Sequence, residues 1–360
     1  MPEPVPEAIR DALRAVSTGQ PLTPEAAEAF MAAVLDGAVT PAQLGGMLIG
    51  MHARGETPGE LAGFVRAMRS RAHAVSAPAG TIDTCGTGGD VRGTFNISTA
   101  SALVVAAAGV TVAKAGNRAV SSQAGSSDVM RALGLTVEQS AGAAEASLRD
   151  NGFAYLHAPS FHPGMRHAGP VRMELGVRTA FNMIGPLANP ARPRRQLVGV
   201  PDAAAAEAVA AALFELGTER AFVVHGDRLD ELPLDGSGVI LDVSSDGIQS
   251  RTVSATEVGL DEAPTEAFSG GTGELWIFSR PLNGSSAGTT SPASKCASGG
   301  SMHAEAYHIS SNIERLLIAT SIIFAVGSWM AATCPWATRL TSDAALVVSI
   351  TSNEYLSDER

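Results

Sequence analysis

With 360 residues, of which 45% are hydrophobic and 17% charged, the chain has a globular composition that excludes intrinsic disorder and leaves room for two domains. A net charge of −11 argues against general nucleic-acid binding, which requires a basic surface. Three cysteines are too few for a disulfide framework, and the N-terminus lacks the basic and apolar regions of a signal peptide, so we expect a cytoplasmic protein.

Residues 1–77 have the pattern of a small helical domain. Thr23, Thr40 and Thr57 each precede a proline, as an N-cap residue precedes proline at the first helical position. Gln43 and Glu60 lie three residues after the second and third of these threonines and complete capping boxes. A stripe of apolar residues on one helical face indicates core or a subunit interface rather than a cofactor site: Leu44, Met47, Leu48 and Met51.

From residue 78 onward, short apolar segments alternate with helical patterns. We expect strands near Thr81 and over 110–114, 196–200 and 221–225, and helices over 96–109, 127–133, 141–151 and 202–216. This alternation predicts an α/β domain over residues 78–360 with a mostly parallel central sheet. Ligand loops then lie at the carboxyl ends of the strands.

The stretch from Asp83 to Ser126 is the strongest candidate for a ligand site. Three glycines within 86–89 let main-chain N–H groups point into one concavity, because no Cβ blocks the approach. The helix start at Asn96 and the segment 114–126 add N–H groups, hydroxyls and two cations. A tight turn of small residues would not need all three parts, so a polyphosphate ligand is predicted for Gly86, Gly88, Gly89, Asp90, Thr94, Asn96, Ser98, Thr99, Lys114, Gly116, Asn117, Arg118, Ser121, Ser122 and Ser126.

A second group of candidate residues runs from His162 to Pro190. Within it, Arg172 offers a planar fork that can clamp a carboxylate through two parallel hydrogen bonds. A surface ion pair between Arg172 and Glu174 is the alternative, and spacing alone does not decide between the two.

A third candidate is the pair Asp230 and Glu231, just past the apolar strand that ends near His225. Hard oxygen ligands in a loop suit Mg²⁺, which usually also binds water and substrate phosphate. A solvated acidic turn is the alternative for a bare pair of carboxylates.

The loop Gly86–Asp90, the residues Asn96-Ile97-Ser98-Thr99 and the segment Lys114–Ser126 resemble anthranilate phosphoribosyltransferases, and the resemblance covers about residues 5–274. It implies that the polyphosphate ligand is phosphoribosyl pyrophosphate, bound with two Mg²⁺ ions that Ser98, Asp230 and Glu231 hold. It also implies that Arg172 meets the carboxylate of anthranilate, and that the acceptor is surrounded by Gly86, Asn117, His162, Met165 and Gly185.

The same resemblance implies the fold and reaction of that family. The fold is nucleoside phosphorylase/phosphoribosyltransferase-like, with helices from about 165–190 packing on a helical domain that carries a homodimer contact. The reaction is phosphoribosyl transfer to the amine of anthranilate in tryptophan biosynthesis, with Lys114 and Arg172 stabilising charge. No nucleophile or general base is assigned, and neither nucleic acid nor membrane is an expected partner. Arg178 is interpreted as structural, tying the hinge between the domains.

The chain departs from the family pattern in three places. Ala115 stands where the family commonly has histidine, and Arg228 lies within the acidic loop. Residues 275–360 do not match, and the apolar run 316–334 within them is interpreted as buried helix and strand rather than a membrane span. A pyrimidine-nucleoside phosphorylase-like enzyme and a non-catalytic phosphoribosyl pyrophosphate-binding paralogue therefore remain as alternatives.

Overall fold

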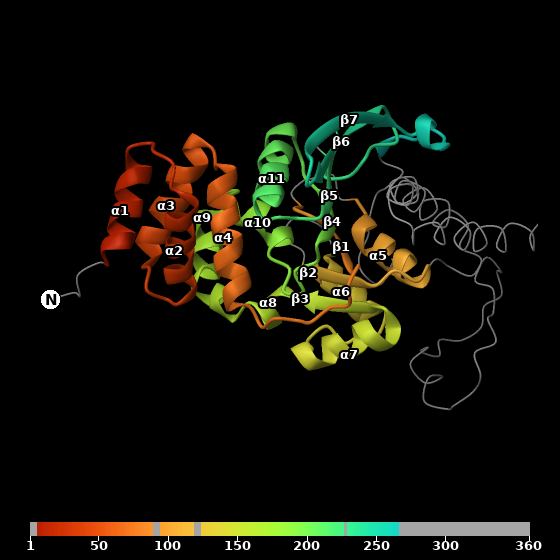
Figure 1. Ribbon diagram of the computed structural model, residues 1–360, viewed down its shortest axis with the longest axis horizontal. Helices are drawn as coiled ribbons and strands as arrows, with labels where there is room; N and C mark the ends of the chain where they lie inside the picture. The colour runs from red at the N-terminus through yellow and green to blue at the C-terminus, as the bar shows by residue number, and fades with distance from the viewer. Residues whose placement is uncertain (1–5, 89–93, 119–123, 227–228, 266–360) are drawn as a thin grey trace, which may run out of the picture.

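The computed structural model describes residues 6–88, 94–118, 124–226 and 229–265, and the structural statements below concern these residues. A bundle of helices precedes an α/β unit, with the bundle on one side of the molecule and the sheet beside it (Figure 1). The bundle contains α1 (Glu7–Ser17), α2 (Pro24–Leu35), α3 (Pro41–Arg54) and α4 (Pro58–Arg71). The fold class predicted from the sequence, a helical unit followed by an α/β unit, is therefore confirmed.

The predicted helix starts of the bundle are confirmed. Thr23, Thr40 and Thr57 are the N-caps of α2, α3 and α4, and each side chain accepts a hydrogen bond from a backbone N–H in the first turn. The capping boxes of α3 and α4 are both present. The apolar stripe on α3 is at most 2% exposed, so it belongs to the core of this chain.

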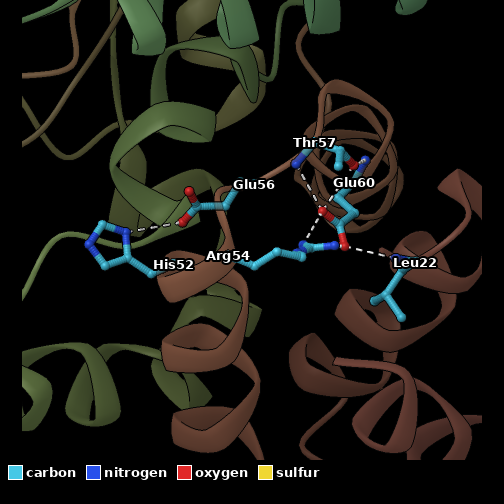
Figure 2. A network of polar contacts seen from close by, with 6 residues as sticks. All are labelled: Leu22, His52, Arg54, Glu56, Thr57 and Glu60. Atoms are coloured by element: carbon cyan, nitrogen blue, oxygen red, sulfur yellow. Dashed lines mark hydrogen bonds and ion pairs between the residues drawn. The ribbon is translucent and has the colours of Figure 1, made fainter. Parts of the chain in front are cut away.

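The turn between α3 and α4 is held by a buried carboxylate. Glu60 accepts hydrogen bonds from Arg54 Nη2 at 2.7 and 2.9 Å, from the Thr57 backbone N–H at 2.9 Å and from the Leu22 N–H at 2.8 Å. Figure 2 shows these contacts converging on one side chain, with His52 and Glu56 as a separate pair beside them. Because Leu22 precedes α2, one capping residue also fixes the link between α1 and α2.

A seven-stranded sheet forms the centre of the α/β unit, in the order β3-β2-β1-β4-β5-β6-β7. The first five strands are parallel, and β6 and β7 form an antiparallel hairpin at one edge. The strands are β1 (Ile82–Gly86), β2 (Val112–Gly116), β3 (Phe153–His157), β4 (Arg195–Gly199), β5 (Arg220–His225), β6 (Ser237–Ser244) and β7 (Gly247–Ser254). The mostly parallel sheet was predicted, whereas β3, β6 and β7 were not, and β2 lies two residues later than expected.

Helices from both halves of the chain pack on this sheet. Helix α5 contacts β1 and β2, α7 contacts β3, and α11 contacts β5 and β6. The helical segments of the unit are α5 (Ile97–Ala107), α6 (Ser126–Ala132), α7 (Ala141–Asn151), α8 (Ala158–Phe161), η1 (Pro163–His167), α9 (Gly169–Leu175), α10 (Ala180–Leu187), α11 (Ala203–Glu215) and η2 (Thr256–Val258). Helix α9 packs on α3, and α10 packs on α3, α4 and α11. In Figure 1, α10 lies between the bundle and the sheet.

The bundle and the sheet share one hydrophobic core. A single cluster of buried apolar side chains contains Phe30 and Met47 of the bundle, Leu187 of α10, Leu213 of α11 and Val198 of β4. Closely packed core side chains transmit a displacement of one element to the next. The helical bundle is therefore fixed to the sheet through α10 and α11.

The strand order creates a switch point between β1 and β4. From β1 the chain moves outward through β2 and β3, and it then returns to β4 on the other side of β1. In open α/β sheets, ligands bind outside the carboxyl ends of the strands at such a point. In the described part of the chain, no helix is both long and apolar enough to cross a bilayer. The run 316–334 lies outside the described residues.

Candidate active site

An acidic side chain is seated at the switch point. Asp230, which is 7% exposed, accepts a hydrogen bond at 2.8 Å from the backbone N–H of Gly88 to its Oδ2 atom. Two glycines at strand ends make room for it. A Cβ at Gly86 would lie 2.5 Å from Asp230 Oδ2, and one at Gly199 would clash with the Asp230 carbonyl oxygen. The loop after β5 can therefore lie across β1 and β4 only because both positions are glycine.

Lys114 brings a buried cation to the same edge of the sheet. Its Nζ donates to the Thr84 carbonyl at 2.6 Å and to Ser98 Oγ at 3.1 Å, and the residue is 1% exposed. Burial lowers the pKa of Lys114, while the negative charge of Asp83 opposes that shift. The side chain thus links β1, β2 and the first turn of α5.

Asp83 lies on the opposite face of β1 from Thr84, because successive side chains of a strand alternate. Its carboxylate accepts hydrogen bonds from Asn189 Nδ2 at 2.8 Å and from the Ala115 N–H at 3.2 Å. Burial raises the pKa of Asp83 to about 6, although Lys114 and these hydrogen bonds act in the other direction. Asn189 also donates to the Ala113 carbonyl at 2.8 Å, so this pair joins β1 and β2 to the chain after α10.

The start of α5 is tied to its neighbours on both sides. Thr84 Oγ1 donates to the Ser98 carbonyl at 2.9 Å, and Asn96 Nδ2 donates to the Ala124 carbonyl at 2.9 Å. Thr99 is completely buried, and its Oγ1 has no hydrogen-bond partner among the described residues. The two hydrogen bonds therefore fix the position of the helix start at which the anion site is predicted.

A tyrosine holds the start of α6. Tyr155 on β3 places its hydroxyl 2.9 Å from both Ser126 Oγ and Ser127 Oγ, and Ser126 Oγ also donates to the Asn117 carbonyl at 3.2 Å. A Cβ at Gly116 would lie 2.5 Å from the Tyr155 hydroxyl and clash with Ser126 Oγ. Gly116 is therefore required by close packing at the end of β2.

In the predicted acceptor segment, Arg172 has an aromatic neighbour. Its guanidinium lies 4.9 Å from the ring centroid of Phe181 on α10. Burial lowers the pKa of Arg172, and no ion pair to it is found within the described residues, so the alternative pairing with Glu174 is not observed. Such a guanidinium can bind a carboxylate without first breaking an ion pair within the protein.

The other predicted acceptor residues differ in their surroundings. His162 is buried, and burial lowers its pKa to about 4 despite a hydrogen bond with the Ala188 backbone, so its imidazole is neutral at pH 7. Met165 packs partly buried against the main core. A Cβ at Gly185 would meet nothing within 4 Å. The predicted acceptor residues thus include a neutral ring, a thioether and the Arg172 guanidinium.

Arg178 connects this segment to the glycine loop. Its Nη1 donates to the Gly88 carbonyl at 2.9 Å. The sequence indicates a structural residue at the hinge, and the structure places its guanidinium against the backbone of a predicted phosphate-binding residue. The backbone of Gly88 is therefore held by Asp230 on one side and by Arg178 on the other.

The donors for a metal ion are oxygen atoms. Among the described residues, no group of three or more histidine, cysteine, aspartate or glutamate side chains is arranged to hold a metal. Asp230 and Glu231 supply two carboxylates, and a hydroxyl oxygen such as Ser98 Oγ has two lone pairs, of which Lys114 uses one. Two carboxylates completed by water and ligand phosphates are what Mg²⁺ takes, so this set fits that ion.

Two family models match nearly the whole described chain. Residues 10–72 match the helical bundle domain of a glycosyl transferase family, and residues 79–302 match its a/b domain. Anthranilate phosphoribosyltransferase from Herpetosiphon aurantiacus is 47% identical over 268 residues, which is 74% of this chain and 79% of the relative. The chain belongs to the anthranilate phosphoribosyltransferase family. The enzyme of that name from Chloroflexus aggregans is 49% identical over 265 residues, covering 73% of this chain and 78% of the relative.

Solved structures agree with this assignment. Anthranilate phosphoribosyltransferase from Thermus thermophilus superimposes with a TM-score of 0.71 at 37% identity, covering 92% of this chain and 99% of the other. The Saccharomyces cerevisiae enzyme in complex with PRPP and Mg has a TM-score of 0.67 at 23% identity and covers 75% of this chain and 79% of its own, which shows the shared fold.

Most of the predicted family-site residues lie at one edge of the sheet. Gly86 ends β1 and Gly88 follows it, Lys114 lies within β2 and Gly116 ends it, and Ser98 is in the first turn of α5. Asn117 and Arg118 are exposed, and Thr94 precedes α5. Gly89, Asp90, Ser121, Ser122 and Arg228 lie outside the described residues, so their predicted roles stay predictions.

Sequence reasoning missed several residues that build this site. Gly199 and Tyr155 were not singled out, and Asp83 was noted only as the start of the loop. A glycine at the end of an apolar strand was an available signal for Gly199. Tyr155 had none, because its partners Ser126 and Ser127 are 29 and 28 residues away in sequence. Asn189 lies in the candidate segment 162–190 but was given no role of its own.

Proposed function

We propose that this chain transfers the phosphoribosyl group from phosphoribosyl pyrophosphate to the amine of anthranilate. The products are N-(5-phosphoribosyl)anthranilate and pyrophosphate, as in the second step of tryptophan biosynthesis from chorismate. One observation supports the proposal most strongly. Gly88, Lys114 and Asp230 converge at the switch point of the sheet, in a chain whose family is known. Backbone N–H groups, a cation and carboxylates together suit a ligand with several phosphates.

The donor side contributes position and charge. In the reaction the amine nitrogen forms a bond to the anomeric carbon while the bond from that carbon to pyrophosphate breaks, and the amine then loses one proton to solvent. The ribosyl centre becomes oxocarbenium-like, and negative charge develops on the leaving oxygen. Lys114, held by Thr84 and Ser98, would stabilise that charge from a fixed position at the edge of the sheet.

Magnesium is the expected cofactor, with Ser98, Asp230 and Glu231 as its protein ligands. Support comes from the oxygen donor set described above and from the Saccharomyces cerevisiae enzyme solved with PRPP and Mg. When bound, the ion would neutralise pyrophosphate charge. Asp230 also has a structural role that does not depend on a metal ion, because its carboxylate orients the Gly88 N–H.

On the acceptor side, Arg172 would bind the anthranilate carboxylate through its guanidinium fork, and Phe181 would hold the plane of that fork. A neutral His162 fits an aromatic pocket better than a charged one would, because no counter-ion is needed. Another Saccharomyces cerevisiae structure is in complex with 4-fluoroanthranilate, which is an aromatic acid of the same class.

Three further expectations belong to this proposal. Residues 1–77 form the helical domain and residues 78–360 the donor-binding domain. The helical domain carries a homodimer contact, and the protein acts in the cytoplasm. Light scattering of the purified protein tests the dimer, since a mass near twice 36.8 kDa is expected.

The experiment that tests the function is an assay with anthranilate, phosphoribosyl pyrophosphate and Mg²⁺. Anthranilate should be consumed and pyrophosphate released only when all three are present. The matched variant replaces Asp230 and Glu231 by Asn and Gln, and its activity should require far more Mg²⁺. Phosphorolysis of a pyrimidine nucleoside would instead support the phosphorylase alternative, and donor binding without product would support a non-catalytic paralogue.

A further inference from the structure

The backbone at Gly88 is held from both sides by side chains of distant elements. Its N–H donates to Asp230 Oδ2 at 2.8 Å, and its carbonyl accepts from Arg178 Nη1 at 2.9 Å. Gly88 has a φ of +67°, in the left-handed region that glycine enters freely. Because glycine also leaves that region freely, its own conformational preference does not fix the backbone. The two hydrogen bonds do.

The two side chains come from different parts of the molecule. Asp230 follows β5 in the sheet. Arg178 lies in the short link between α9, which carries Arg172, and α10, which carries its ring partner Phe181. Both of these helices pack on the bundle, as the view in Figure 1 shows for α10 beside α4. A displacement of the acceptor segment would therefore reach Gly88 through one guanidinium.

We propose that Arg178 is a positioning residue that orients the Gly88 backbone for the phosphorylated donor. This rests on the proposed function, because the donor is the one assigned there. Arg178 touches neither substrate in this proposal. It acts by holding the Gly88 carbonyl, and therefore the plane of the peptide bond that follows it, in the loop that would meet phosphate.

The bond geometry separates Arg178 from Arg172. Arg178 makes one charge-assisted hydrogen bond to a carbonyl, which a lysine ammonium can also make. Arg172 would need both arms of its fork for a carboxylate, which a lysine cannot reproduce. Partial rescue by lysine is therefore expected at position 178 and not at position 172.

The test uses Arg178→Met, Arg178→Lys and Arg166→Met in the full chain. Arg166 is an exposed arginine of the neighbouring turn whose bond is to the nearby Pro163 carbonyl at 3.4 Å, so it is the matched control. The first readout is hydrogen exchange of the Gly88 amide without any ligand. The second is calorimetric affinity for phosphoribosyl pyrophosphate with Mg²⁺, and the third is the KM for anthranilate at saturating donor.

Arg178→Met should speed exchange at Gly88 and weaken donor affinity by about ten- to a hundredfold, the effect of losing a hydrogen bond to a charged group. The KM for anthranilate should stay within about twofold of the parent, because Arg178 does not meet the acceptor carboxylate. Arg178→Lys should lie between, and Arg166→Met should match the parent in all three readouts.

Two results would overturn the inference. One is an Arg178→Met protein that exchanges and binds donor like the parent. The other is faster exchange, or a lower Tm, with donor affinity unchanged, because that result leaves Arg178 a merely structural residue. Failure of the parent to bind the donor would instead contradict the proposed function, and the exchange readout would still decide whether Arg178 holds Gly88.

Discussion

The two halves of the candidate active site differ in how their charged side chains are held in the free protein. At the donor side, the charged groups already have protein partners: Lys114 donates to Thr84 and Ser98, and Asp230 accepts from Gly88. At the acceptor side, Arg172 stacks on Phe181, and no described carboxylate pairs with it. The proposed donor site is built from hydrogen bonds within the protein, whereas Arg172, the proposed acceptor cation, is held by packing.

This difference has an energetic consequence. A donor phosphate must share or replace contacts that Lys114 makes in the free protein, so the gain on binding is partly offset. Arg172 has no described carboxylate to give up, while burial lowers its pKa and thus disfavours its charged form. A bound carboxylate would relieve that cost. The donor site is therefore expected to be rigid and the acceptor site to gain most from its ligand.

The largest effect is expected from Lys114→Met. Removing the buried cation should lower kcat/KM for the donor by about a thousandfold, since one partner of a desolvated charge pair is lost. The Tm should also fall by several degrees, because the buried Thr84 carbonyl and Ser98 lose their donor. Kinetics and thermal melts of the same preparation check both parts. A KM for anthranilate that rises as much as the KM for the donor would contradict the division into two sites.

The next effect is at Arg172. Arg172→Ala should weaken acceptor use by about a hundredfold, because a bidentate charged pair is lost from a sheltered position. Arg172→Lys should recover little, since the ammonium lacks the planar fork. The KM for each substrate is measured in both variants, with Arg166→Met as the exposed arginine control. An equal rise in the donor KM would assign Arg172 to the phosphate site or to the fold.

A smaller effect, on stability, is expected at Asp83, which joins the two halves through Asn189. Its pKa is about 6 in the folded protein and near 3.8 when unfolded, so the folded state binds more protons between these values. The contribution of Asp83 to stability therefore increases as pH falls from 7 to 4, by about 2 kcal/mol. Urea unfolding of the parent and of Asp83→Asn at several pH values tests this. A difference between the two proteins that does not vary with pH would show that Asp83 does not titrate there.

The smallest effect is expected from Tyr155→Phe. The Tyr155 hydroxyl forms hydrogen bonds with Ser126 and Ser127 at the border of the predicted donor segment. When this hydroxyl is removed, Ser126 keeps its hydrogen bond to the Asn117 carbonyl. We expect donor KM to rise about threefold with kcat and acceptor KM unchanged, as for one lost neutral hydrogen bond. Ser127→Ala is the matched variant, because it removes a bond to the same hydroxyl without touching the predicted donor residue Ser126. A change confined to Tm in both variants would make Tyr155 structural only.

The sequence by itself determined the local structure and the chemical character of the site. Thr40 and Thr57 cap their helices as predicted, because a capping box is a contact between residues three positions apart. The helix start at Asn96 is local in the same way, and α5 begins one residue after it. The roles of the glycine loop and of the acidic pair Asp230 and Glu231 stay predictions, although the residue types that suggested them are visible in the sequence.

Only the tertiary structure decided which of these parts touch. The hydrogen bond from Gly88 to Asp230 spans 142 positions, and that from Arg178 to Gly88 spans 90. The fit of Asp230 against Gly199 is a matter of backbone atoms brought together by strand order. Contacts of this kind follow from how strands pair and helices pack. A local sequence pattern does not specify that arrangement. The sequence alone therefore indicates a hinge residue at Arg178, whereas in the fold its guanidinium donates to the Gly88 carbonyl.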